Sequence, residues 1–173
     1  MGTSDSAILA IVGGGNMGAA LAGGLLSSGF ITTNDLMIVE VLEARRQHLA
    51  QLFPGVTISA TIGPCGSAVI AVKPPDVPAA ANACVGAGAT RVLSIAAGVT
   101  IKTLESASGA GVTVVRAMPN TPALVGQGAS GIAGGTHATQ ADLEWAQAVL
   151  GSVGIVVTVP EAQLDAVTGL VGS

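Results

Sequence analysis

The chain has 173 residues, which is enough for one α/β domain and the beginning of another. Only 9% of the residues are charged, against roughly 25% in ordinary soluble domains, and ten Asp and Glu outnumber six Lys and Arg for a net charge of −4. This balance excludes a basic nucleic-acid groove, and the scarcity of charge predicts that part of an apolar surface is covered by another subunit or segment.

The sequence gives little sign of export or of membrane insertion. No apolar run reaches the roughly 18 residues needed to cross a bilayer, and the leader over residues 1–6 has Asp5 and no basic residue, unlike a signal peptide. Cys65 and Cys84 lack the spacing of metal ligands, so we expect two reduced thiols and no metal site. We therefore expect a cytoplasmic protein without membrane contact.

The first expected strand, residues 8–12, has five apolar residues without polar alternation, which is typical of a strand buried on both faces. The following turn has the pattern G-x-G-x-x-G at Gly13, Gly15 and Gly18, and a helix is expected over 16–28. In dinucleotide sites these glycines make the turn, admit a pyrophosphate and let the helix pack closely, while the helix N-terminus binds the phosphates. A strand-turn-helix unit that binds nothing would show the same pattern.

A second strand, expected over 36–39, ends at Glu40, about 20 residues beyond the last glycine of the motif. At this place a carboxylate accepts hydrogen bonds from the adenosine ribose of NAD. Arg45 and Arg46 follow on a helix expected over 43–52, and either could bind the 2′-phosphate of NADP instead or simply face solvent. The sequence therefore leaves NAD and NADP open.

The rest of the chain continues the alternation of strands and helices. Strands are expected at 56–58, 68–72, 91–95, 112–117, 130–133 and 155–159, and helices at 76–86, 100–106, 139–150 and from 160 onward. Thr100 is the expected N-cap of its helix. The pattern predicts an α/β fold, a Rossmann-like doubly wound and mostly parallel sheet with helices on both faces.

Three loops follow the carboxyl ends of expected strands, where open α/β sheets bind their ligands. Lys73 and Asn120 are therefore candidate contacts to cofactor or substrate, although each could be an ordinary surface or turn residue. Ala96 begins a run of small residues that would let a ring or ribose lie against the backbone. His48 and His137 have no partners arranged as a catalytic triad requires, so both are expected on the surface.

Several segments taken together resemble pyrroline-5-carboxylate reductase. They are IVGGGNMG at 11–18, AVKP at 71–74, SIAAG at 94–98, VRAMPNTPALV at 115–125 and QLDAVT at 163–168. The glycine motif occurs in many dehydrogenases, whereas the Arg-x-Met-Pro-Asn block after a Lys-Pro block is much more specific.

The resemblance implies an N-terminal NAD(P)-binding domain, residues 1–160, and a C-terminal helical dimerisation domain that begins at 161–173 and is otherwise missing from this chain. It implies reduction of the cyclic imine 1-pyrroline-5-carboxylate to L-proline, the last step of proline biosynthesis, by a homodimer or higher homo-oligomer. The residues and the resemblance together suggest Asn120 and Lys73 as catalytic groups. The expected contacts to NADP or NAD are Gly13, Gly14, Gly15, Asn16, Met17, Gly18, Glu40, Arg45, Ala71, Val72, Lys73, Pro74, Ala96, Met118 and Pro119.

One stretch departs from the family. Ile62 and a short link over 63–66 stand where the family usually has an Asn and a short helix, which leaves one ribose contact in doubt.

Imine reduction suits the residue inventory of this chain. A protonated cyclic imine is already electrophilic, so the enzyme must mainly align it with the nicotinamide, whereas a carbonyl reductase needs an acid such as Lys, His or Tyr, and the chain has no Tyr. Two alternatives remain: another Rossmann-type reductase of imines or 3-hydroxy acids, and a non-catalytic dinucleotide-binding or assembly module. The 173-residue chain alone is expected to bind cofactor with little or no activity.

Overall fold

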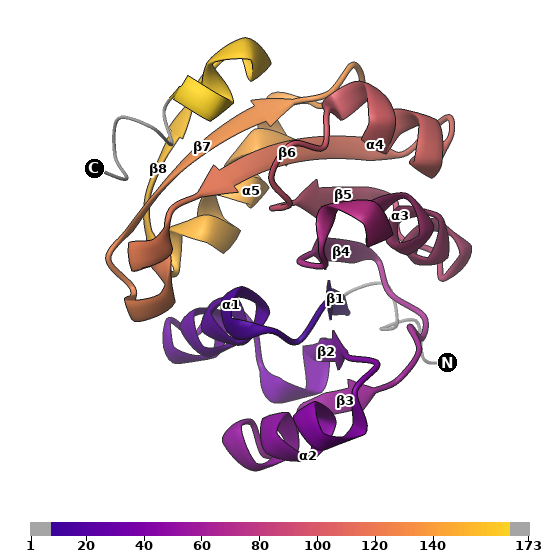
Figure 1. Cartoon of the computed structure of the whole chain (residues 1–173), viewed down its shortest axis with the longest axis vertical. Coiled ribbons are helices and arrows are strands. Elements are labelled where there is room, and N and C mark those ends of the chain that lie inside the picture. The colour runs from indigo at the N-terminus through magenta and orange to yellow at the C-terminus, as the bar shows by residue number, and fades with distance from the viewer. Residues whose placement is uncertain (1–7, 167–173) are drawn as a thin grey trace.

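The computed structural model describes residues 8–166, so the leader and the end of the helix expected from 160 onward lie outside the described residues. Strands and helices alternate along most of the chain, and β4 follows β3 without a helix between them (Figure 1). The strands are β1 (Leu9–Val12), β2 (Leu36–Val39), β3 (Thr57–Ser59), β4 (Ser67–Ile70), β5 (Arg91–Ser94), β6 (Thr113–Pro119), β7 (Gly128–Gly134) and β8 (Gly154–Thr158). The α-helices are α1 (Asn16–Ser27), α2 (Glu43–Leu52), α3 (Val77–Gly86), α4 (Ile101–Ser108) and α5 (Gln140–Gly151). The 3₁₀ helices are η2 (Thr33–Asp35), η3 (Pro74–Asp76), η4 (Thr121–Val125) and η5 (Glu161–Gln163).

All these strands join one sheet in the order β3-β2-β1-β4-β5-β6-β7-β8. Pairing is parallel from β3 to β6, β7 runs antiparallel to β6, and β8 is parallel to β7. The chain moves outward in one direction from β1 to β3 and then in the other from β4, as in Rossmann sheets. The predicted fold class is confirmed.

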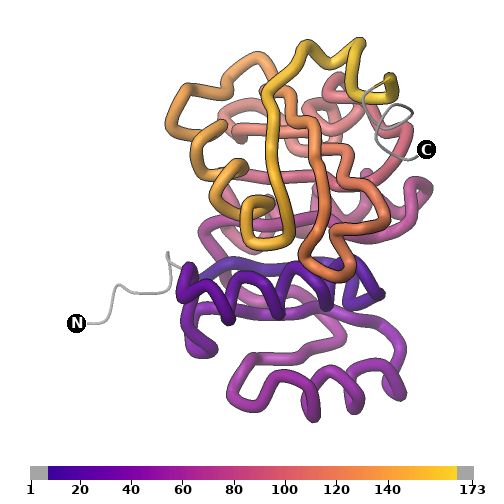
Figure 2. Tube along the Cα trace, turned by 90° about the vertical axis from the view of Figure 1, so that its left-hand side faces the viewer, coloured from indigo at the N-terminus to yellow at the C-terminus, as the bar shows by residue number. Residues whose placement is uncertain are grey.

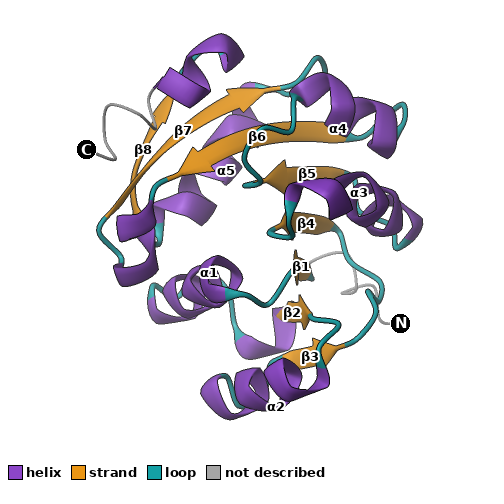
Figure 3. Ribbon diagram, in the orientation of Figure 1, coloured by secondary structure: helices purple, strands orange, loops and turns teal. Residues whose placement is uncertain are grey.

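Helices cover both faces of the sheet (Figure 3). One core cluster contains Leu9 and Ile11 of β1 together with residues of α1, α2 and α5, and the other contains Ala10 together with residues of α3 and α4. Because successive side chains of a strand point to opposite faces, a strand between two helical layers must be apolar throughout. This explains the unbroken apolar run of β1.

The β6–β7 connection, which contains η4, contacts α1, and the turned view of Figure 2 shows it lying against that helix. The strand predicted at 130–133 extends to Gly128–Gly134, because β6 pairs with it as far as Gly134 and β8 pairs with it from Gly128. The fold thus brings the loop after β6 close to the helix that follows the glycine turn.

The helix expected over 100–106 begins as predicted, because the Thr100 side chain accepts a hydrogen bond from the Thr103 N–H at 3.2 Å. Beyond Pro160 the chain forms η5 and then begins a helical turn over 164–166. Within residues 8–166, no helix is both long enough and apolar enough to cross a membrane.

The link between β3 and β4 contains no helix and lies against the neighbouring elements. The Cys65 N–H donates to the Ala87 carbonyl at 3.1 Å, and the Gly66 N–H donates to the Ile8 carbonyl at 3.0 Å. Cys65 and Cys84 are free and buried, which confirms the expected thiols. Burial raises the pKa of both thiols, and it raises the pKa of Cys84 to about 12, so neither forms a thiolate readily in the folded chain.

Candidate functional site

The glycine turn follows directly from the end of β1. Gly13 has a φ of +108°, and a Cβ built there would lie 2.5 Å from the Ala71 carbonyl oxygen, so a side chain is excluded by both conformation and space. A Cβ on Gly18 would collide with the Gly13 carbonyl oxygen. The structure therefore gives the first and third glycines the roles expected for them: a tight turn and close packing of α1.

Gly15 differs from these two glycines because nothing lies within 4 Å of the position that its Cβ would occupy. Gly15 is also the N-cap of α1, and the N–H groups in the first turn of a helix have no partners within that helix. The helix dipole adds a partial positive charge at this end. An exposed backbone, free donors and a positive potential together form a suitable seat for a phosphate group.

A hollow of about 380 Å³ opens in front of this turn, at the carboxyl ends of β1, β2 and β4; we call it the glycine-turn hollow. Its lining residues are Val12, Gly13, Gly15, Val39, Glu40, Val41, Leu42, Ala71, Val72, Lys73 and Asp76. Six of the expected contact residues thus line one hollow: Gly13, Gly15, Glu40, Ala71, Val72 and Lys73. Lys73 is exposed and is the one basic side chain in this lining.

The Glu40 carboxylate is held firmly beside the glycine turn. Its Oε2 accepts a hydrogen bond from the Gly14 N–H at 3.0 Å, and its Oε1 accepts one from the Leu42 N–H, also at 3.0 Å. Both donors are backbone groups, so the position of the carboxylate is fixed by the fold itself.

The two arginines of α2 are directed elsewhere. The Arg45 Nε donates to the Gly14 carbonyl at 2.6 Å, and one Arg46 Nη1 donates to the Glu40 and Val41 carbonyls at 2.9 and 2.8 Å. Arg45 lines a different hollow, between α1 and α2, which also contains Asn16 and His48. The structure therefore does not bring Arg45 into the glycine-turn hollow.

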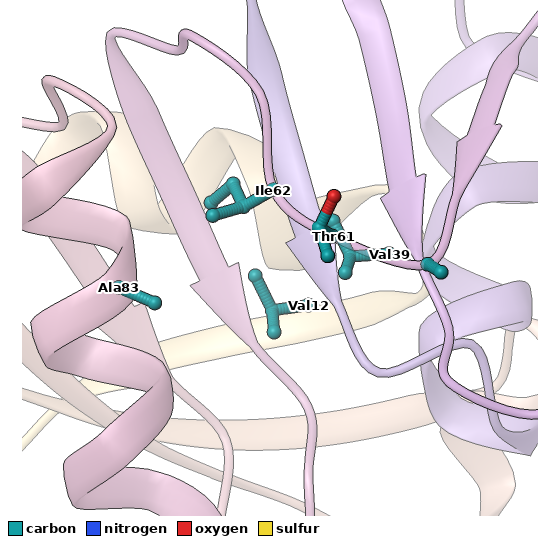
Figure 4. A pocket seen from close by; sticks show the side chains of 6 residues that line it. Val12, Val39, Thr61, Ile62 and Ala83 are labelled. Carbon is teal, nitrogen blue, oxygen red and sulfur yellow. The ribbon is translucent and has the colours of Figure 1, made fainter.

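A second, apolar hollow of about 280 Å³ shares Val12 and Val39 with the first (Figure 4). Its other walls are Ala60, Thr61 and Ile62, which precede the short link, and Ala83 of α3. Residue reasoning missed this hollow. The shortened link was the available signal, because the chain forms no helix between β3 and β4.

The remaining expected residues lie outside the glycine-turn hollow. Asn120 is 7% exposed; its Oδ1 accepts a hydrogen bond from the Ala129 N–H at 2.9 Å, and its own N–H donates to the Ala129 carbonyl at 3.2 Å. Asn120 thus closes the connection between β6 and β7. Ala96 is buried, and Met118 and Pro119 are half-buried on β6.

Gly14, Asn16, Met17 and Pro74 surround the turn without lining its hollow. Gly14 is buried against Glu40 and Leu49, Asn16 is exposed at the start of α1, and Met17 packs against the core. Pro74 is exposed at the start of η3. His48 and His137 are exposed, as expected.

Arg116 is a buried charged residue to which the sequence alone assigned no role. Arg116 is 3% exposed on β6 and forms ion pairs with Glu161 at 3.0 Å and Asp165 at 3.2 Å. Among the described residues its buried Nε has no hydrogen-bond partner. A lone arginine in an apolar strand was the available signal.

Comparison with known proteins agrees with this geometry. The family model described as "NADP oxidoreductase coenzyme F420-dependent" matches residues 8–98. A curated relative from Mycobacterium tuberculosis, named pyrroline-5-carboxylate reductase, is 43% identical over 95% of this chain and 59% of its own length. One of the same name from Mycobacterium leprae is 41% identical over 98% of this chain and 60% of its own length.

Among solved structures, a pyrroline-5-carboxylate reductase from Coxiella burnetii matches with a TM-score of 0.88 and 26% identity, over 97% of this chain and 64% of that one. The resemblance seen in the motif segments is confirmed, and the chain spans about three fifths of the length of the curated relatives it matches. Since the family model covers more than half of the chain, the chain belongs to the family of NADP oxidoreductases described as coenzyme F420-dependent.

Proposed function

We propose that this chain is the cofactor-binding part of a reductase that converts 1-pyrroline-5-carboxylate to L-proline with NAD(P)H. The observation that carries the proposal is the open space at Gly15, at the N-terminus of α1 and facing a hollow at the carboxyl ends of the strands. The names of the curated relatives support the choice of substrate.

The residues present fit a nicotinamide dinucleotide. The diphosphate would be held by the glycine turn, because a Cβ at Gly15 would point into free space rather than into protein. Glu40 would accept hydrogen bonds from the adenosine ribose. The apolar hollow formed with Ile62 suits the flat adenine ring (Figure 4). Lys73, the one basic side chain in the lining of the glycine-turn hollow, would attract the phosphates.

When bound, the reduced nicotinamide supplies a hydride to the C=N carbon of the imine. The chain's own contribution is to position and shield. Met118 and Pro119, on the strand before the loop that contacts α1, would border the reacting region and limit the access of water. Asn120 keeps that loop in place through Ala129, so its role in the reaction is to fix the backbone beside the substrate.

The protein is further proposed to act as a cytoplasmic homo-oligomer whose second, helical domain begins near residue 161. Ile155 and Val157 of β8, the last strand in the sheet order, are 70% and 48% exposed. Exposed apolar side chains in a row are typical of a surface covered by another segment or subunit.

The test is oxidation of NADH and of NADPH by the full-length protein with 1-pyrroline-5-carboxylate. We expect a substrate-dependent loss of absorbance with at least one cofactor, and the 173-residue chain is expected to bind cofactor with little turnover. A full-length protein that binds dinucleotide but shows no oxidation above the substrate-free rate would contradict the proposed reaction. Faster oxidation with a 3-hydroxy acid or another imine would identify a different substrate.

A further inference from the structure

We infer that the adenosine end of the site selects NAD(H) over NADP(H), with Glu40 as the discriminating residue. This inference rests on the proposed function, because it concerns the same dinucleotide site. The family description names NADP. The inferred preference for NAD(H) is therefore argued from residues of this chain and not from the family.

The first step concerns where the Glu40 carboxylate is held. Two backbone N–H groups, of Gly14 and Leu42, bind one carboxylate oxygen each, and Gly14 belongs to the glycine turn itself. A carboxylate has about four acceptor sites, so two remain for the hydroxyl groups of a ribose. The fold thus presents a fixed acceptor beside the place where the diphosphate is expected.

The second step concerns the residues around that carboxylate. Val41 and Leu42 complete this side of the glycine-turn hollow, and their side chains are 77% and 65% exposed. Neither side chain has a hydroxyl, amide or cationic group that could bind a 2′-phosphate. That phosphate would bring about two negative charges close to Glu40 without a compensating donor from these side chains.

The third step concerns the arginines. Arg46 donates to the Glu40 and Val41 carbonyls, and Arg45 donates to the Gly14 carbonyl and lines the hollow between α1 and α2. Neither arginine lines the glycine-turn hollow. Glu40 is therefore inside the hollow and the two arginines of α2 are outside it, while Lys73, the one basic side chain in the lining, follows β4 rather than β2. This arrangement favours ribose hydroxyls over a phosphate beside Glu40.

The experiment measures binding rather than turnover. The 173-residue chain is titrated with NADH and with NADPH, followed by nicotinamide fluorescence, and in parallel with ADP and 2′-phospho-ADP by calorimetry. We expect the wild-type Kd for NADH to be at least about tenfold lower than that for NADPH, with the same order for the ADP pair. The ADP pair tests the preference at the adenosine end without any variant.

Glu40→Gln keeps the size of the side chain and removes its charge, so it is expected to bring the two Kd values to within about threefold of each other. Glu43→Gln is the matched control, because Glu43 is exposed on the first turn of α2 and does not line the hollow. It removes the same charge and is expected to leave the ratio unchanged. Thermal unfolding of each variant checks that the fold is retained.

Wild-type chain that binds NADPH as tightly as NADH, or tighter, would overturn the inference while leaving the proposed function intact. An unchanged ratio in a folded Glu40→Gln variant, or an equal change in Glu43→Gln, would remove Glu40 as the discriminator and would also overturn it. Absence of binding by every dinucleotide would overturn the proposed function itself.

Discussion

Arg116 on β6 donates a hydrogen bond from Nη1 to Oε1 of Glu161 at 3.0 Å, and the same oxygen accepts one from the Ile101 N–H at 2.7 Å. One carboxylate therefore joins β6, the first turn of α4 and the segment that follows β8. The arrangement fixes the direction in which the chain continues beyond β8.

Glu161→Ala is expected to lower the free energy of unfolding by about 2 to 3 kcal/mol, because it leaves the buried Arg116 guanidinium with one partner fewer. Asp165→Ala is the matched comparison, since Asp165 binds the same guanidinium but its side chain is 73% exposed. Asp165→Ala should lower the free energy of unfolding by less than about 1 kcal/mol, as for other exposed ion pairs. Urea unfolding of both variants measures the difference, and equal losses would show that the burial of the pair is unimportant.

Gly15→Ala and Gly18→Ala should separate binding from folding. An alanine at 15 meets open space, so the free energy of unfolding should change by less than about 1 kcal/mol, while dinucleotide affinity falls at least about tenfold because the methyl group enters the phosphate seat. An alanine at 18 meets the Gly13 carbonyl and should cost at least about 2 kcal/mol of stability. Normal dinucleotide affinity in Gly15→Ala would contradict the position assigned to the diphosphate.

Asp142 links stability to pH. Burial raises its pKa, but hydrogen bonds from the backbone and hydroxyl of Thr139 and from Arg91 outweigh burial and hold the pKa of this carboxyl below its usual range. A carboxyl whose pKa is lower in the folded state than in the unfolded state stabilises the protein at pH values above its unfolded-state pKa. This stabilisation is lost as the pH falls through the folded-state pKa.

At neutral pH we therefore expect Asp142→Asn to lower the free energy of unfolding by about 1 to 2 kcal/mol, since the charged acceptor of the capping box is lost. The deficit should shrink as the pH falls through the lowered pKa of the folded carboxyl, where the wild-type side chain also becomes protonated. Urea unfolding at a series of pH values follows the difference. Glu144→Gln, at an exposed position of the same helix, serves as the control. A deficit that stays constant with pH would mean that charge is not involved.

Lys73→Gln should weaken dinucleotide binding by about tenfold and make the affinity less sensitive to salt, because one attraction to the phosphates is removed. Stability should not change, since Lys73 is exposed. The chain has one other lysine, and Lys102→Gln, an exposed site on α4, removes the same charge far along the sequence. Calorimetric titration at two salt concentrations measures both effects; similar losses in the two variants would indicate a general effect of net charge.

Much of the fold was predictable because local signals agree with one another. The apolar run of β1, the glycines of the turn and the Thr100 cap each have a physical cause within a few residues. β7 was only weakly indicated, because a strand rich in glycine and serine depends on its pairing with β6 more than on its own residues.

The site was predictable only in part, because side-chain direction depends on the whole fold. The spacing placed Glu40 correctly beside the glycine turn, but it could not tell which hollow Arg45 lines. Asn120 follows the carboxyl end of a strand as expected, yet its side chain is directed to Ala129. The Arg116 ion pairs join residues 45 and more positions apart, which no local pattern indicates.

The most direct measurement follows the backbone amide signals of the ¹⁵N-labelled chain by NMR while NADH is added. A diphosphate bound at the N-terminus of α1 would give saturable shifts that are largest at Gly13, Gly15 and Asn16. In Gly15→Ala the same shifts would need at least about tenfold more NADH. Saturable shifts confined to other parts of the sheet, or no shifts at any NADH concentration tested, would contradict the assignment of this turn as the dinucleotide-binding site.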